Sequence, residues 1–194
     1  MTTPFGTTVA QNSFQTDSTG FIQGMMAVDP AARNNLVAGR IKPDDNNVYY
    51  GGLPIIENVA ELKPSGTPVI QLATAVADII GFTVFNQTNN LFLFGANTVP
   101  VTHNGGTINF LRFGSNARIA LPCDPALRKY LNTPVSQAYV SWDFTKNQLI
   151  AGSESSNIPV RLLDMNFQSN VVAVDSATQN VTWNTQGTCA LVLL

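Results

Sequence analysis

Between Asp78 and Arg112 the chain contains no Asp, Glu, Lys or Arg, and this charge-free stretch constrains the fold more than any other part of the sequence. Its apolar runs are short and rich in β-branched and aromatic residues, which favour strands. Asn-Asn and Asn-Gly-Gly separate the runs, Phe-Gly-Ser follows directly after Arg112, and these residues are typical of tight turns. The pattern predicts a series of short β-strands with few groups for catalysis.

The composition of the whole chain supports an all-β fold. Charged residues make up only 11% of 194 residues, compared with roughly a quarter in a typical globular protein, so the surface must be polar through amides and hydroxyls. The 14 Gly and 11 Pro suit a chain with many turns. We therefore predict one compact β-barrel or sandwich-like body of short antiparallel strands over residues 36–194.

The apolar runs place the strands along this body. We expect strands at 36–41, 48–50, 53–59, 69–77, 82–85, 91–94, 107–113, 117–121, 138–144, 148–151, 160–165, 170–174, 181–183 and 188–194. The run at 69–77 also fits a helix, but Gly81 and β-branched residues follow it and favour a strand. Residues 107–113 are apolar on both faces, which predicts a strand between two layers. The apolar ending CALVLL predicts a central C-terminal strand, because an exposed one would aggregate.

Residues 1–35 differ from the body and are predicted to form an extended N-terminal arm. Large apolar side chains are scattered there among Thr, Ser, Gln and Gly without helical or strand periodicity. Such side chains either dock into grooves on the body or on another chain, or belong to a disordered tail. Residues 29–33 could begin one short helical turn, with Asp29 as its N-cap and Pro30 at its first position. The candidate interface residues are Phe5, Phe14, Phe21, Ile22, Met25 and Met26.

Charge and hydropathy argue against several classes of partner. The net charge of −2 and the lack of clustered Lys and Arg disfavour nucleic acid. The longest apolar passage, 69–85, is too short and too polar to span a membrane, and the N-terminus has no secretory signal pattern. We therefore expect a protein made in a cytoplasm. Cys123 and Cys189 are expected to be two buried thiols, with a disulfide between them as the alternative.

No catalytic or metal-binding pattern emerges from the sequence. His103 is the only histidine and lies at a predicted hairpin tip, and one His with two distant Cys cannot form a zinc site. Asp44-Asp45-Asn46-Asn47 is expected to be a turn, because the Glu that a calcium loop requires does not follow. Asn104-Gly105-Gly106 lacks the Lys-Ser or Lys-Thr of a phosphate-binding loop. We therefore expect no enzyme activity, cofactor or metal.

The order of these segments resembles a known family. The relevant segments are Gly24–Asp29, 36–41, Val48-Tyr49-Tyr50-Gly51-Gly52, 80–86, Gly106–Ser115, 117–121, a hairpin at 133–151 and the closing Ala190-Leu191-Val192-Leu193-Leu194. Together they are similar to the cement, or head decoration, proteins of tailed bacteriophages. Gly106-Thr107 stands where Gly-Asp is common in that family.

The resemblance implies a structural role on a virus particle. It implies an all-β body that binds the outer surface of a capsid lattice as a small homo-oligomer, either a dimer or a trimer, without catalysis or cofactor. Its partners would be the major capsid protein and other copies of itself, and it would reach the virion after synthesis in the host cytoplasm. The alternative from another class is a tail, fibre or carbohydrate-binding module, in which an exposed Trp142 or Trp183 would stack on sugar; both are more easily placed in the core.

Overall fold

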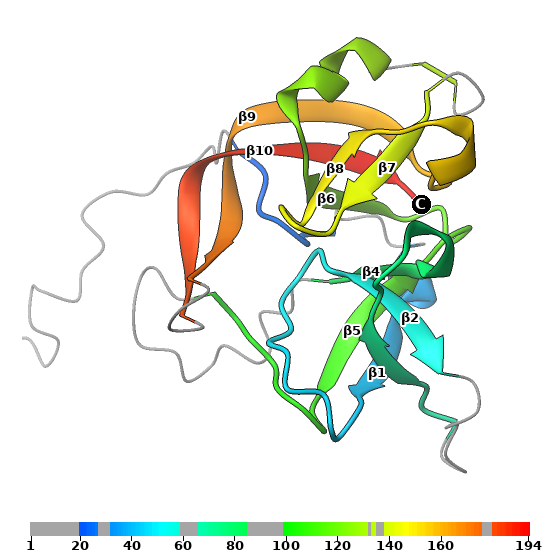
Figure 1. Ribbon diagram of the computed structural model, residues 1–194, viewed down its shortest axis with the longest axis vertical. Coiled ribbons are helices and arrows are strands. Elements are labelled where there is room, and N and C mark those ends of the chain that lie inside the picture. The colour runs from blue at the N-terminus through cyan, green and yellow to red at the C-terminus, as the bar shows by residue number, and fades with distance from the viewer. Residues whose placement is uncertain are drawn as a thin grey trace, which may run out of the picture.

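The structure is a computed structural model that describes residues 20–26, 32–58, 66–84, 99–131, 133–134, 138–175 and 180–194. Over these residues the fold is all-β, as the sequence predicts (Figure 1). It consists of a closed five-stranded barrel, a three-stranded sheet and a two-stranded hairpin. Within the described residues, no helix is long and apolar enough to cross a membrane.

The barrel is built from the first strands of the chain. Their order around the barrel is β1 (Val37–Ile41), β3 (Val69–Leu72), β2 (Pro54–Asn58), β4 (Gly81–Thr83) and β5 (Thr107–Arg112), and β5 pairs back with β1. The β1–β3 pair is parallel, so the prediction of antiparallel strands is wrong there. An odd ring cannot alternate strand direction all the way round, so closing five strands requires at least one parallel pair.

Strand β5 lies between two apolar clusters, which confirms the prediction from its two apolar faces. Ile108 and Phe110 join a cluster drawn mainly from the barrel strands. The neighbouring Leu111 instead packs into the larger core cluster that the barrel shares with the rest of the molecule. Phe82 of β4 belongs to the same large cluster, where its ring lies 5.3 Å from that of Trp142 and 5.9 Å from that of Phe113.

The second half of the chain forms a three-stranded sheet. Its order is β6 (Arg118–Pro122), β10 (Val181–Leu193) and β9 (Arg161–Val174), so the C-terminal strand is central, as predicted. Ala190 and Val192 of β10 are fully buried. Because β10 is paired on both sides, its backbone N–H and C=O groups are not available for pairing with other molecules.

The long strands β9 and β10 correct the prediction of four short strands in this region. The mostly polar segments 166–169 and 184–188 suggest breaks in the sequence, but in the structure they lie within β9 and β10, which continue past them with shifts in register. At these irregularities, side chains replace ladder bonds: Asn166 Oδ1 accepts from the Gln168 N–H at 2.7 Å, and Asn184 Oδ1 from the Gln186 N–H at 3.0 Å. The hairpin bends, and its far end lies beside the barrel (Figure 1).

A smaller hairpin joins β7 (Val140–Asp143) to β8 (Gln148–Ala151), within the predicted 133–151 hairpin. Its turn forms because Asp143 Oδ1 accepts hydrogen bonds from the backbone N–H groups of Thr145 and Lys146, at 2.8 and 3.1 Å. Asn147 has a φ of 49°, a left-handed conformation that Asn tolerates better than most residues.

Short 3₁₀ helices occupy several connections. They are η2 (Ala32–Asn35), η4 (Val76–Asp78), η6 (Pro125–Tyr130) and η7 (Glu154–Ser156). The predicted strand over 69–77 therefore ends at Leu72, and the helical pattern in its second half becomes η4. Asp124 caps η6 by accepting from the Ala126 N–H at 2.8 Å. Of the helical turn predicted over 29–33, Ala32 and Arg33 lie in η2, and residues 29–31 lie outside the described residues.

Other predicted strands are shorter than expected or lie outside the description. The 48–50 run contributes only an isolated bridge between Tyr49 and Thr102. Strand β4 ends at Thr83 instead of residue 85, and the predicted strand at 91–94 lies outside the described residues. Thr83 is fully buried, and both its backbone and its hydroxyl form hydrogen bonds with the loop that precedes β2.

Candidate functional site

The candidate interface residues fall into two groups. Phe5 and Phe14 lie outside the described residues. Phe21, Ile22, Met25 and Met26 belong to residues 20–26, which we call the strap and which appears in blue in Figure 1. The sequence predicts that this segment belongs to the arm, and in the structure it lies against the body of the same chain.

The strap forms main-chain hydrogen bonds with both outer strands of the three-stranded sheet. On β9, the Asn170 N–H donates to Phe21 O at 2.8 Å, and the Gln23 N–H donates to Asn170 O at 2.9 Å. On β6, the Gly24 N–H donates to Ala120 O at 2.7 Å, and the Ala120 N–H donates to Met25 O at 3.0 Å. The strap therefore joins the two edges of one sheet.

Gln23 ties the strap to the barrel as well. Its side chain is 1% exposed, its Nε2 donates to Gly51 O at 3.1 Å, and its Oε1 accepts from the Val172 N–H of β9 at 2.9 Å. The loop that holds Gly51 is itself fixed to β4, because the Thr83 hydroxyl donates to Tyr50 O at 2.6 Å. One buried amide therefore connects the strap, the sheet and the barrel.

The close approach of two loops at this junction requires glycine. Gly24 has a φ of 76°, and a Cβ added there would lie 2.4 Å from the carbonyl carbon of Gly51. Gly52 has a φ of 85° and packs in turn against the Gln23 side chain. No sequence pattern identified Gln23 or Gly24 as residues of this junction. The Gly51-Gly52 pair, which contacts them, was recognisable only as a break between two predicted strands.

The strap side chains differ in how far they are buried. Met26 is half-buried and packs against the large core cluster. Phe21 and Ile22 are also half-buried, whereas Met25 is 41% exposed. Among the described residues, the other large apolar side chains with comparable exposure are Phe167 at 42% and Val174 at 45%.

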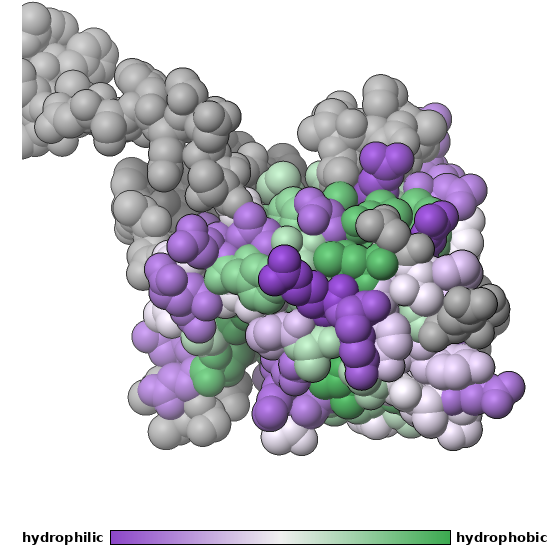
Figure 2. Space-filling model, turned by 90° about the horizontal axis from the view of Figure 1, so that it is seen from above, coloured by the Kyte–Doolittle hydropathy of each residue, from purple (hydrophilic) through white to green (hydrophobic). Residues whose placement is uncertain are grey.

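The surface of the body is therefore largely polar. Figure 2 shows one face, on which apolar side chains form separate patches between polar ones. Even exposed Phe167 is partly covered, because the guanidinium carbon of Arg128 lies 5.6 Å from the centre of its ring.

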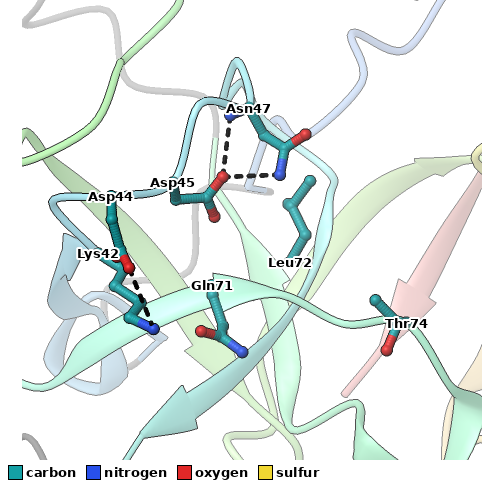
Figure 3. A pocket seen from close by; sticks show the side chains of 7 residues that line it. All are labelled: Lys42, Asp44, Asp45, Asn47, Gln71, Leu72 and Thr74. Carbon is teal, nitrogen blue, oxygen red and sulfur yellow. Dashed lines mark hydrogen bonds and ion pairs between the residues drawn. The ribbon is translucent and has the colours of Figure 1, made fainter.

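A polar pocket of about 270 Å³ lies beside the barrel (Figure 3). It is lined by Lys42, Asp44, Asp45, Asn47, Gln71, Leu72 and Thr74. Asp45 Oδ1 accepts from the backbone and side-chain N–H groups of Asn47, and its Oδ2 accepts from the Tyr49 hydroxyl at 2.5 Å. The turn predicted at Asp44-Asp45 is present, and both carboxylate oxygens of Asp45 accept hydrogen bonds from the residues that follow it.

The surroundings of this pocket do not assemble a reactive group. Burial raises the pKa of Tyr49, and its hydrogen bond to Asp45 adds to the effect, so the phenol stays protonated. His103 is exposed and lines an adjoining pocket with Asn104 and the 45–47 turn. In the part of the chain that the structure describes, no group of three His, Cys, Asp or Glu side chains could hold a metal ion.

Both tryptophans contact apolar clusters. Trp142 is 3% exposed, which confirms its prediction as a core residue and leaves no ring face for a sugar. Trp183 is half-buried against the cluster of Tyr50, Leu53 and Val99. The buried Trp142 ring therefore cannot serve as the stacking platform of the carbohydrate-binding alternative.

The cysteines are two free, buried thiols, as expected. Burial raises the pKa of Cys189 to about 12, although a hydrogen bond with Ser169 acts in the opposite direction. Burial also raises the pKa of Cys123, and the nearby Cys189 and Asp124 raise it further.

The thiols should be unreactive in the folded protein. Because both pKa values are raised, the thiols stay protonated at pH 8, and only a thiolate attacks a disulfide reagent. We expect no reaction of the native protein with a chromogenic aromatic disulfide at pH 8, and reaction of both thiols after unfolding in guanidinium. Rapid labelling of the native protein would show that this region of the sheet opens readily.

Comparison of the chain with protein-family models, with curated proteins and with solved structures finds no match.

Proposed function

We propose that this protein is a virion structural protein that binds the outer surface of a phage capsid lattice and cements neighbouring major-capsid-protein subunits. The observation that carries the proposal is the strap. It fixes the N-terminal segment, in which Asp17 is the one charged side chain among residues 1–26, to a body whose barrel is closed. The strap also joins the two outer strands of the sheet β6-β10-β9. Such a body can serve as a rigid base, with recognition assigned to the segment that precedes it.

The length of that segment suits contact with a neighbouring subunit. Residues 1–19 would span at most about 60–70 Å if fully extended. Phe5 and Phe14 lie within them, and burying one phenylalanine side chain contributes about 1.5–3 kcal/mol. A stable interface needs about 1,200–2,000 Å², and a homo-oligomer gains further from effective concentration when several copies contact one lattice.

Sedimentation with capsids tests the proposal. Purified protein is mixed with expanded capsids that lack decoration, assembled from the major capsid protein of the same virus. We expect the protein to pellet with the capsids and to saturate at a fixed ratio of copies per capsid subunit. The proposal fails if the protein stays in the supernatant at micromolar concentration.

Binding to the capsid should depend only weakly on salt. The chain has few charged residues, and the strap and the two N-terminal phenylalanines are uncharged. Few ion pairs can therefore contribute to the interface, and added salt should screen little of the binding energy. We expect the dissociation constant to change by less than about tenfold between low and high salt. A larger loss would indicate an interface built on ion pairs, with side chains such as Arg128 and Lys129 as the first to test.

A further inference from the structure

We propose that the strap is a clasp that opens and closes as a unit while the barrel and the sheet β6-β10-β9 stay folded, with Gln23 as its latch. This inference concerns the free protein and does not depend on the capsid proposal. It rests on the way the strap is bonded, on the burial of its one polar side chain and on the packing of a single strap side chain, Met26, against a core cluster.

Gln23 is the latch because both ends of its amide are used at a buried position. It donates to Gly51 O and accepts from the Val172 N–H, so it holds a barrel loop and β9 at the same time. With the side chain only 1% exposed, water cannot replace these bonds while the strap is closed. An apolar side chain of similar size would fill the same space, but Gly51 O and the Val172 N–H would lose their hydrogen bonds to the strap.

The strap can open alone because the rest of the fold does not need it. The strands of the barrel complete a ring without it, and β10 pairs with both β6 and β9 along the sheet. Only Met26 of the strap packs against the large core cluster, while Met25 is 41% exposed. Segments with few buried apolar contacts open at a lower free energy than the core.

Opening would uncover strand edges. The N–H and C=O groups of Ala120 on β6 and of Asn170 on β9 are bonded to the strap in the closed state. Once released, they form two edges able to accept an extended peptide segment, a common mode of strand addition. The clasp therefore controls whether this sheet presents edges for pairing.

Amide hydrogen exchange of the full chain, measured by NMR, tests the clasp. The Ala120 and Asn170 N–H groups report on the strap, and the Thr83 and Val84 N–H groups, bonded to Leu53 O and Asn109 O, report on the barrel. We expect the strap reporters to exchange at least tenfold faster than the barrel reporters. Gln23→Met should accelerate the strap reporters by a further factor of about ten to a hundred and leave the barrel reporters unchanged.

Two further variants make the test decisive. Ile22 and Asn170 are bridge partners, so a disulfide between Ile22→Cys and Asn170→Cys should lock the strap and slow Ala120 to the rate of the barrel reporters. Gln186→Met changes an exposed glutamine of β10 in the same way and should leave all rates as they are. The proposal is overturned if strap and barrel reporters exchange at one rate in the unmodified protein, if the lock has no effect, or if Gln186→Met matches Gln23→Met.

Discussion

Replacing Phe82 with alanine is expected to lower the free energy of unfolding by about 3–5 kcal/mol. The ring is fully buried in β4, where it contacts Trp142 from the hairpin and Phe113 just after β5. These contacts join the barrel to the rest of the core, so the cavity left by the ring cannot be filled by moving one element alone. Urea unfolding of both proteins, followed by tryptophan fluorescence and circular dichroism, measures the difference.

Phe167→Ala is the matched control for this substitution. The same atoms are removed, but the Phe167 ring is 42% exposed and contacts the Arg128 side chain at the surface. We expect its effect to stay below about 1 kcal/mol. Equal effects of the two substitutions would contradict the central place of Phe82 in the core.

Deleting residues 1–19 is expected to weaken capsid binding by at least about a hundredfold and to leave the body folded. The deletion removes Phe5 and Phe14, and two buried phenylalanine anchors account for about 3 kcal/mol or more. The cut leaves the strap intact, including Gln23 and its bonds to the barrel and β9. Sedimentation with capsids measures the binding, and urea unfolding measures the stability of the truncated protein.

Two variants separate binding from folding in this experiment. The full chain with Phe5→Ala and Phe14→Ala should reproduce most of the binding loss without shortening the chain. Deleting residues 1–26 removes the strap as well and should lower the stability of the body, because Ala120, Asn170 and Val172 lose hydrogen-bond partners. Undiminished capsid binding by the protein lacking residues 1–19 would place recognition on the body.

Strand positions were predictable where a short apolar run is bounded by turn residues. The run at 107–113 is apolar on both faces, and β5 does lie between two clusters. Prediction failed for the long hairpin, because Asn166 and Asn184 are residues of turns in sequence statistics but here cap irregular ladder positions. It also failed at 73–77, where the chain leaves the barrel and forms η4.

The candidate site was only partly predictable for a related reason. The apolar side chains at Phe21 and Met26 indicate a segment that must dock, but their spacing does not say on what. Gln23 carries no sequence signal, since a glutamine between apolar residues is more often exposed. Its burial depends on Gly51 O and the Val172 N–H, which only the folded chain brings to the same place.

The amino-acid sequence by itself determined the all-β class, the shortage of charge and the central place of the C-terminal strand. These follow from local propensity and from the cost of exposing apolar strands, both of which can be evaluated residue by residue. Tertiary structure alone decided the parallel β1–β3 pair, the bend of the β9–β10 hairpin and the docking of the strap on β6 and β9. All three depend on hydrogen bonds between backbone groups far apart in the chain, and those groups are chemically the same at every residue except proline.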